Sequence, residues 1–288
     1  MSDKTAPVPQ DHGQEGFLTF HGLRHHYIRW GDPGADPVVF LHGLMNTARY
    51  WEHIANMMLP EYCVYALDLR GHGRTEHAPG GYLVWAFARD LQAFVEQLDL
   101  EVFDLVAHSI GSRVAMAYAR DHSNRIKHLV LADMGPEMAP AGARGIRKNM
   151  GESKGQPGFA TEAEALQHFA ALYPGQPDEF LRRQLADSLE LDEASGRLVF
   201  RWDPGLHEAT GKGAIVEIPF LWESLEHITC PTLLIRAEKS RVLSPEIAER
   251  MVELLPNARF VEIPGSGHQI PLHQPGRFAA AVKDFLGS

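Results

Sequence analysis

A repeated alternation between short apolar runs and longer amphipathic segments limits the folds that are open to this chain. It begins near residue 37. Runs rich in β-branched and other apolar residues occur at 38–41, 63–67, 102–107, 126–132, 232–237 and 258–263. Segments with helical periodicity separate most of these runs, and the clearest are 84–98, 112–122, 244–255 and 275–286. Buried strands that alternate with helices form parallel sheets covered on both sides. We therefore predict an α/β fold: a mostly parallel, twisted sheet with helices on both faces.

Two intervals depart from this alternation. Between Phe17 and Trp30, two short alternating segments flank a His-Gly pair, which predicts an antiparallel hairpin at a sheet edge. Residues 135–219 contain helical stretches interrupted by Pro and Gly, and they include no convincing core strand, although 195–205 is compatible with an extended arm. We predict a division into a disordered tail, a core domain in two parts and a helical cap inserted between them: residues 1–15, 16–134 with 220–288, and 135–219.

Charge and composition narrow the classes of partner. The formal net charge of −10 disfavours nucleic acid and anionic membranes, because both attract cationic surfaces. The first residues lack the apolar core of a signal peptide, and no run approaches the ~18 apolar residues of a membrane span. Cys63 and Cys230 each adjoin an apolar stretch, so we expect buried free thiols. We predict a cytoplasmic protein that acts on a small molecule, as a monomer or a homodimer.

Ser109 is the candidate nucleophile. The segment LVAHSIGSRVAMAYA (105–119) places this serine between an apolar strand and a helical pattern. A tight strand-to-helix turn needs small residues two positions before and after the serine, and Ala107 and Gly111 meet that need. The usual pattern is G-x-S-x-G, and Ala107 adds one methyl group to it. The alternative is a serine that only caps a helix.

The segment VVFLHGLMNTARYW (38–51) is a strand followed by His-Gly and a helix start. In a turn of this kind a backbone N–H stabilises the oxyanion that forms during acyl transfer. Leu44 N–H and Ile110 N–H are the candidate oxyanion donors. The alternative is that His42-Gly43 is only a turn. Further along, we interpret Asp68, Arg70 and His72 as structural residues of a tight loop.

His268 is the candidate base, because the glycine-rich loop that carries it lies between the last strand and the last helix. The order nucleophile, acid, base calls for a carboxylate between Ser109 and His268. After the run 232–237 the chain has Ser240 where an Asp would be expected. Asp133 follows the preceding run, at a strand end where catalytic groups gather, so we assign it as the acid. Glu238 is the reserve candidate.

Residues in and beside the predicted cap are the candidates for substrate contacts. Each one, taken singly, is also compatible with core packing. We select Met134, Arg147, Tyr173, Trp202 and Trp222. No metal site and no cofactor is predicted, because the histidines and cysteines show no ligand spacing such as H-E-x-x-H.

With these residues assembled, the chain from about Phe17 to Leu286 resembles the α/β-hydrolase superfamily. A serine at the elbow separates it from the related haloalkane dehalogenases and epoxide hydrolases, which use Asp there. The acid in LADMGP and the loop IRAEKSRVLS resemble a subgroup of small serine esterases whose acid follows the sixth strand. The chain also resembles the (E)-2-(acetamidomethylene)succinate hydrolases, which cleave an amide, in the segment AALYPGQP (170–177). In that segment Leu172 stands where those enzymes carry an Arg.

The resemblance and the motifs together predict a cofactor-independent serine hydrolase that cleaves a carboxylic ester through an acyl-enzyme. Three alternatives stay open. The same residues are able to cleave an amide or a carbon–carbon bond of a small carboxylated metabolite. A histidine base also serves cofactor-free oxygenation or perhydrolysis on this scaffold. The third alternative is a non-catalytic binding protein.

Overall fold

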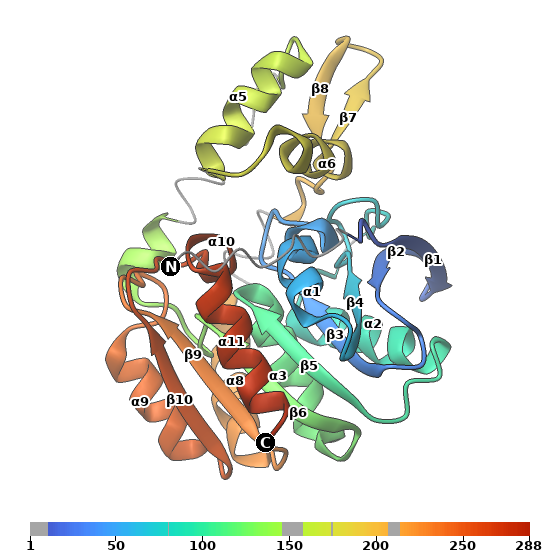
Figure 1. The fold of residues 1–288 in the computed structure, drawn as a ribbon. Coiled ribbons are helices and arrows are strands. Elements are labelled where there is room, and N and C mark those ends of the chain that lie inside the picture. The colour runs from blue at the N-terminus through green and yellow to red at the C-terminus, as the bar shows by residue number, and fades with distance from the viewer. Residues whose placement is uncertain (1–10, 80, 146–157, 174, 207–213) are drawn as a thin grey trace, which may run out of the picture.

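A single eight-stranded sheet forms the centre of the molecule (Figure 1). The computed structural model describes residues 11–79, 81–145, 158–173, 175–206 and 214–288. The strands lie in the order β1-β2-β4-β3-β5-β6-β9-β10, and every pair from β4 to β10 is parallel. The predicted α/β fold with a mostly parallel sheet is therefore confirmed. The strands span β1 (Gln14–Phe20), β2 (Leu23–Trp30), β3 (Asp36–Leu41), β4 (Tyr62–Leu67), β5 (Phe103–His108), β6 (Ile126–Ala132), β9 (Thr232–Ala237) and β10 (Ala258–Ile263).

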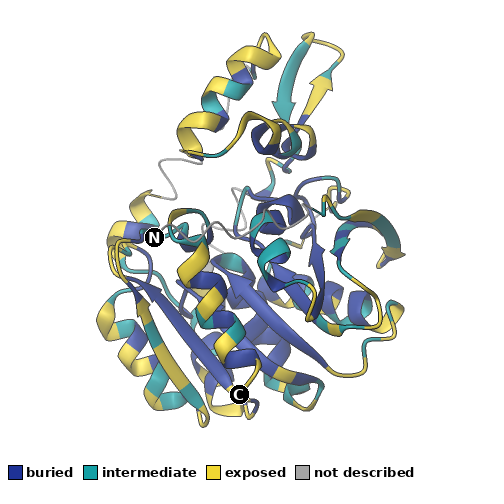
Figure 2. Ribbon diagram, in the orientation of Figure 1, coloured by how far each residue is buried: buried dark blue, intermediate teal, exposed yellow. Residues whose placement is uncertain are grey.

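Helices cover both faces of this sheet. Alternate residues of each strand point to opposite faces, so each face contributes to its own apolar cluster. Val39 and Leu41 of β3 belong to one apolar cluster, while Val38 and Phe40 belong to a second. The central strands are buried along their length (Figure 2). The first cluster packs against α2 (Val84–Gln97), α3 (Ile110–His122), α8 (Ala214–His227) and α9 (Pro245–Leu254), and the second against η1 (Ala48–Trp51), α1 (Glu52–Met58) and α11 (Pro275–Leu286). Two shorter helices are η2 (Ser123–Arg125) and α10 (Ile270–His273).

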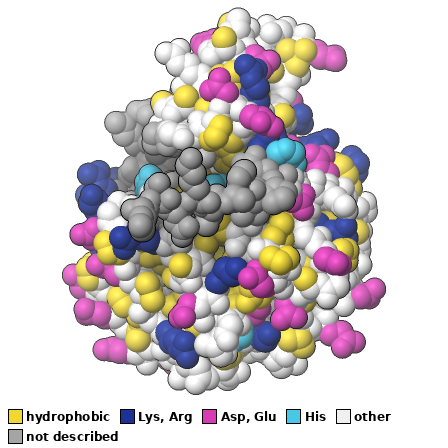
Figure 3. All heavy atoms as spheres, viewed as in Figure 1, with side chains coloured by type: hydrophobic (Ala, Val, Ile, Leu, Met, Phe, Trp, Pro, Cys, Tyr) yellow, Lys and Arg dark blue, Asp and Glu magenta, His cyan; other side chains and the backbone are white. Residues whose placement is uncertain are grey.

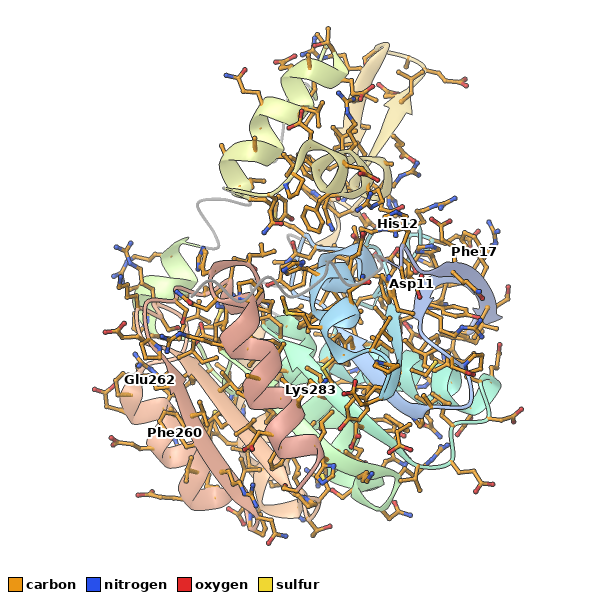
Figure 4. The ribbon with its side chains drawn as sticks, viewed as in Figure 1. Asp11, His12, Phe17, Phe260, Glu262 and Lys283 are labelled. Atoms are coloured by element: carbon orange, nitrogen blue, oxygen red, sulfur yellow. The ribbon has the colours of Figure 1, made fainter. Side chains whose placement is uncertain are left out.

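The N-terminal hairpin forms the edge of the sheet, as predicted. β1 pairs with β2 in antiparallel fashion, and His21 and Gly22 turn the chain with φ values of 50° and 74°. The predicted boundary of the disordered tail is wrong, because β1 begins at Gln14. Even Asp11 is ordered: its amide donates to Asn56 Oδ1 at 2.8 Å and its carboxylate accepts from the Gly31 amide at 3.1 Å (Figure 4). These polar contacts to distant residues hold a segment whose composition alone indicates a flexible chain.

A separate group of elements lies beyond one end of the core (Figure 1). It contains α5 (Glu162–Leu172), α6 (Asp178–Ser188) and a hairpin of β7 (Leu189–Asp192) with β8 (Arg197–Phe200). The two helices occupy the stretches with helical periodicity, and β8 lies within the segment that we expected to be extended. We call the group formed by α5, α6, β7 and β8 the cap. It combines two helices with a hairpin. The boundary expected at residue 219 falls inside α8, which continues through Pro219.

Two ion pairs and a hydrogen bond connect this cap to the core. Arg49 Nε of η1 lies 2.7 Å from Asp187 Oδ2 of α6, and both side chains are buried. Gln184 Nε2 donates to the Arg49 carbonyl at 2.6 Å. One turn away, Arg183 Nη2 lies 2.7 Å from Glu52 Oε1. Moving α6 away from the core would leave the charge of Arg49 or Asp187 buried without its partner, which is destabilising. These contacts therefore hold α6 against η1 and α1.

Three further observations bear on the composition-based predictions. Cys63 and Cys230 are both free and buried, as expected. In the described part of the chain, no helix is long and apolar enough to cross a membrane. On the face shown in Figure 3, acidic and basic side chains are interspersed.

Candidate active site

Ser109 occupies the sharp turn between β5 and α3. Its backbone has φ 56° and ψ −126°, a conformation that non-glycine residues rarely adopt and that is found at functional sites. A Cβ on Gly111 would lie 2.6 Å from the Leu41 carbonyl oxygen and 2.8 Å from that of His42. The turn therefore requires glycine at position 111, whereas Ala107 is accommodated within β5.

His268 lies on the loop between β10 and α10, and its ring contacts both other predicted members of the triad. Nε2 lies 3.0 Å from Ser109 Oγ, and Nδ1 lies 2.8 Å from Asp133 Oδ2. A carboxylate only accepts, so Nδ1 carries the ring hydrogen and Nε2 presents a lone pair to the serine hydroxyl. The loop thus presents the imidazole in the tautomer that a general base requires.

Asp133 comes from the end of β6 and is completely buried. Its Oδ1 accepts from the Ala237 amide at 2.9 Å, and its Oδ2 accepts from the Ser240 hydroxyl at 2.7 Å as well as from His268. Since β6 and β9 are parallel neighbours, their carboxyl ends meet at the same edge. Glu238, the reserve candidate, is exposed and accepts from the Gly265 amide at 2.7 Å instead.

Ser240 is a site residue whose role the sequence reasoning missed. Its Oγ accepts from the Val242 amide at 3.1 Å and from the Leu243 amide at 3.0 Å. Because both acceptor positions of the oxygen are taken, the hydroxyl hydrogen is directed to Asp133. The sequence signal for this role is the position of Ser240, which stands where the acid of the triad is expected. Its hydroxyl contacts Asp133, the acid at the end of the preceding core strand.

The two candidate oxyanion donors are the backbone amides of Leu44, on the loop that follows β3, and of Ile110, the residue after Ser109. Leu69 N–H donates to His42 Nε2 at 3.0 Å, so His42 Nδ1 carries the hydrogen and donates to the Gly43 carbonyl at 2.7 Å. Burial lowers the pKa of His42, which keeps this ring neutral. In a trans peptide C=O and N–H point in opposite directions, so the Leu44 N–H points away from His42. Ile110 begins α3, and its N–H therefore has no acceptor within the helix.

Of the predicted substrate contacts, Tyr173 reaches the loop between β3 and η1, which also carries Leu44. Its hydroxyl donates to Asn46 Oδ1 at 3.4 Å, and it comes from the end of α5. Met134 is buried directly after Asp133. Trp202 and Trp222 belong to the apolar cluster against α2 and α3, where Trp222 Nε1 donates to a glutamate oxygen at 3.2 Å. Arg147 lies outside the described residues.

The loop between β4 and α2 has the structural character that we expected. Asp68 accepts from His26 Nδ1 at 2.7 Å and from the Arg74 amide at 2.9 Å. Arg70 binds Asp90 through Nε and Nη2. Complete burial lowers the pKa of His72 to about 3, so this ring is neutral. Within the described part of the chain, the side chains of Asp68, Arg70 and His72 form no hydrogen bond or ion pair with Ser109 or His268.

Comparison with known proteins agrees with this architecture. The family model described as the α/β-hydrolase fold matches residues 36–275. The chain belongs to the α/β-hydrolase family. This confirms the fold and the superfamily that the motifs indicated.

Two curated relatives and one solved structure show how far the likeness of this hydrolase extends. The 3-hydroxybutyrate-oligomer hydrolase of Cupriavidus necator is 28% identical over 272 residues, which cover 91% of this chain and 92% of that protein. The putative 2-succinyl-6-hydroxy-2,4-cyclohexadiene-1-carboxylate synthase of Bacillus subtilis is 28% identical over 269 residues, covering 93% and 96%. The crystal structure of E-2-(acetamidomethylene)succinate hydrolase superposes with a TM-score of 0.85 at 20% identity, covering 96% of this chain and 100% of that one.

Proposed function

We propose that this hydrolase cleaves a small-molecule carboxylic ester through a covalent acyl-enzyme on Ser109. One observation carries the proposal. His268 lies 3.0 Å from Ser109 Oγ through Nε2 and 2.8 Å from Asp133 Oδ2 through Nδ1, so nucleophile, base and acid form one continuous chain. In a Ser-His-Asp triad, this chain of contacts activates the serine for acyl transfer.

The reaction proceeds in two halves. His268 Nε2 takes the Ser109 proton as Oγ bonds to the acyl carbon, and the carbonyl electron pair moves onto oxygen. When the tetrahedral intermediate collapses, the bond to the alcohol oxygen breaks and His268 gives that oxygen its proton. A water molecule then loses a proton to His268 and attacks the acyl carbon. The bond from the acyl carbon to Ser109 Oγ breaks and His268 returns the proton to Oγ, which releases the acid and restores the serine.

Asp133 serves both halves without changing its own protonation. It holds the His268 ring in the required tautomer and stabilises the positive charge that the ring acquires. The Ser240 hydroxyl and the Ala237 amide fix the carboxylate, so it does not turn away from the histidine. The Leu44 and Ile110 amides stabilise the oxyanion, and removing one such donor typically costs about 10²–10³-fold in rate.

The choice of an ester over other acyl bonds draws on a relative. The Cupriavidus protein is named a hydrolase of 3-hydroxybutyrate oligomers and aligns over nearly its whole length, which supports cleavage between an acid and an alcohol. The Bacillus relative is named a putative synthase. The assay must therefore distinguish bond types as well as detect activity.

The test has two stages. Wild type is treated with a fluorophosphonate probe beside Ser109→Ala, and failure of the wild type to label would refute the serine-hydrolase proposal. Wild type is then assayed on p-nitrophenyl esters of increasing acyl length and on the matched p-nitroanilides. We expect ester turnover that Ser109→Ala lowers by about 10⁴-fold or more. Preferential cleavage of the anilides would move the assignment from ester to amide bonds.

A further inference from the structure

Three buried polar side chains lie beside the nucleophile turn, and the proposed reaction does not use them: His108, Asn46 and Tyr173. His108 precedes Ser109 in the chain and is completely buried. Its Nε2 lies 2.8 Å from the carbonyl oxygen of His268. Because a carbonyl only accepts, Nε2 carries the hydrogen and Nδ1 is left as an acceptor.

The charge state of His108 agrees with this assignment. Burial, followed by the nearness of His268, holds the pKa of His108 well below its ordinary value. The ring therefore stays neutral and keeps one donor and one acceptor nitrogen. The ring of Tyr50 stacks on it with 5.6 Å between centroids, and the Tyr50 hydroxyl donates to Gln269 Oε1 at 2.8 Å. His108 and Tyr50 thus hold two consecutive residues of the loop that carries the base.

An unpaired donor lies close to the unpaired acceptor. Among the described residues, neither His108 Nδ1 nor Asn46 Nδ2 has a hydrogen-bond partner. Both flank Gly43: a Cβ on that glycine would lie 3.2 Å from His108 Nδ1 and 3.5 Å from Asn46 Nδ2. The same point lies 3.0 Å from Ser109 Cβ. An unpaired polar group in the interior is destabilising. Asn46 Nδ2 is a donor that needs an acceptor, and His108 Nδ1 is an acceptor that needs a donor.

On the other side, Asn46 contacts the cap. Its Oδ1 accepts from the Tyr173 hydroxyl at 3.4 Å, and this oxygen and Nδ2 belong to the same amide. The last torsion of an asparagine side chain has a broad energy minimum, so the Asn46 amide is able to turn without leaving its rotamer. Gly43 leaves this passage open because it has no side chain.

We propose that Asn46 is a positioning residue whose amide donates to His108 Nδ1, completing a hydrogen-bonded chain from Tyr173 of the cap to the backbone of His268. This inference rests on the proposed function, since it gives the chain the task of holding the base. The Tyr173 hydroxyl orients the Asn46 amide, the amide fixes the His108 ring, and the ring holds the His268 carbonyl. The chain of contacts thereby links the cap to the loop that carries the base.

The test compares the Asn46→Leu substitution in two backgrounds of the full-length protein. Leucine has nearly the shape of asparagine and lacks its donor and acceptor. In the wild-type background we expect kcat for p-nitrophenyl acetate to fall about tenfold or more, with little change in KM, because small displacements of a base cost rate. The second background is His108→Gln, which keeps a donor near the position of Nε2 but removes the Nδ1 acceptor. In that background Asn46→Leu should lower kcat little further.

Two further variants and one NMR measurement distinguish this role from a general loss of stability. Thr47→Val removes a neighbouring buried hydroxyl that also lacks a partner among the described residues, and it should leave kcat nearly unchanged. Tyr173→Phe should lower kcat in the wild type but not in Asn46→Leu. In nitrogen NMR spectra of the histidines, the Nδ1 resonance of His108 should shift in Asn46→Leu as its donor is lost.

The outcomes distinguish this inference from the proposed function. If wild type does not react with the fluorophosphonate, the proposed function fails. If wild type reacts but Asn46→Leu lowers kcat equally in both backgrounds, the positioning role is refuted. A rise in KM with unchanged kcat also refutes it, because that result assigns Asn46 to substrate binding.

Discussion

The sharpest prediction concerns Asp133→Asn, because asparagine preserves the backbone and changes only the hydrogen-bonding pattern. Asp133 has φ 51°, in the left-handed region that asparagine tolerates about as well as aspartate. The carboxylate accepts from three donors: the Ala237 amide, the Ser240 hydroxyl and His268 Nδ1. An amide in its place has only one oxygen, so its orientation decides what is lost.

Neither orientation preserves the site. If the carboxamide oxygen keeps the Ala237 contact, its NH₂ faces His268 and donates to Nδ1. The histidine hydrogen then moves to Nε2, which no longer accepts the Ser109 proton. If the amide is reversed, its NH₂ faces the Ala237 N–H, and two buried donors oppose each other. In both cases the negative charge that stabilises the imidazolium is gone.

We therefore expect kcat to fall by about 10⁴-fold, as when a triad aspartate becomes asparagine. The loss of a hydrogen bond to a charged group should also lower the free energy of unfolding by about 2 kcal/mol. The assay is ester hydrolysis under saturating substrate, with urea unfolding to separate activity from stability.

Glu238→Gln is the matched control. This side chain is exposed and contacts the Gly265 amide, so we expect less than about a fivefold change in kcat. Retention of a tenth or more of the activity by Asp133→Asn would contradict the reasoning. A loss of about 10³-fold in Glu238→Gln would transfer the role of the acid to that residue.

Three other substitutions test the surroundings. Ser240→Ala removes one of the three donors to Asp133 and should lower kcat by about tenfold while the fold persists, and an unchanged kcat would exclude a supporting role. Arg49→Met leaves Asp187 of the cap buried beside a neutral side chain, so urea unfolding should show a loss of about 3 kcal/mol. A loss below about 1 kcal/mol would mean that this ion pair does not anchor the cap. Burial lowers the pKa of His72 to about 3 from 6.5, so its contribution to stability is complete above pH 6.5 and is lost as the pH falls toward 3. Between pH 7.5 and pH 5 this residue should account for about 2 kcal/mol, and His72→Phe should flatten the pH dependence of the unfolding free energy by that amount.

Much of the core fold was predictable because its signals are local. Six apolar runs became the six strands from β3 to β10 that carry the parallel sheet, and four amphipathic segments became α2, α3, α9 and α11. A strand buried on both faces needs a continuous apolar run, and a helix packed on a sheet needs an apolar stripe. The boundary at residue 219 was less accurate, because helical periodicity continues through Pro219 in α8.

The candidate site was predictable for a different reason. The turn around Ser109 requires small neighbours, and the chain order of nucleophile, acid and base is a topological property of the sheet. Local sequence could not reveal that the Ser240 hydroxyl contacts Asp133, because 107 residues separate the two in the chain. It also could not reveal that the Asp11 amide donates to Asn56 Oδ1, because 45 residues separate the two in the chain.

Three features could be read from the amino-acid sequence alone: the alternation of strands and helices, the sharp turn at Ser109 and the three residues proposed for catalysis. These depend on periodicity, on steric limits at one turn and on the order of residues along the chain. Three other features appear only in the folded molecule: the groups that donate to the buried Asp133, the ion pairs between the cap and the core, and the contact of Tyr173 with Asn46. Those contacts join residues far apart in the chain, and they form only when the sheet brings the carboxyl ends of its strands to one edge.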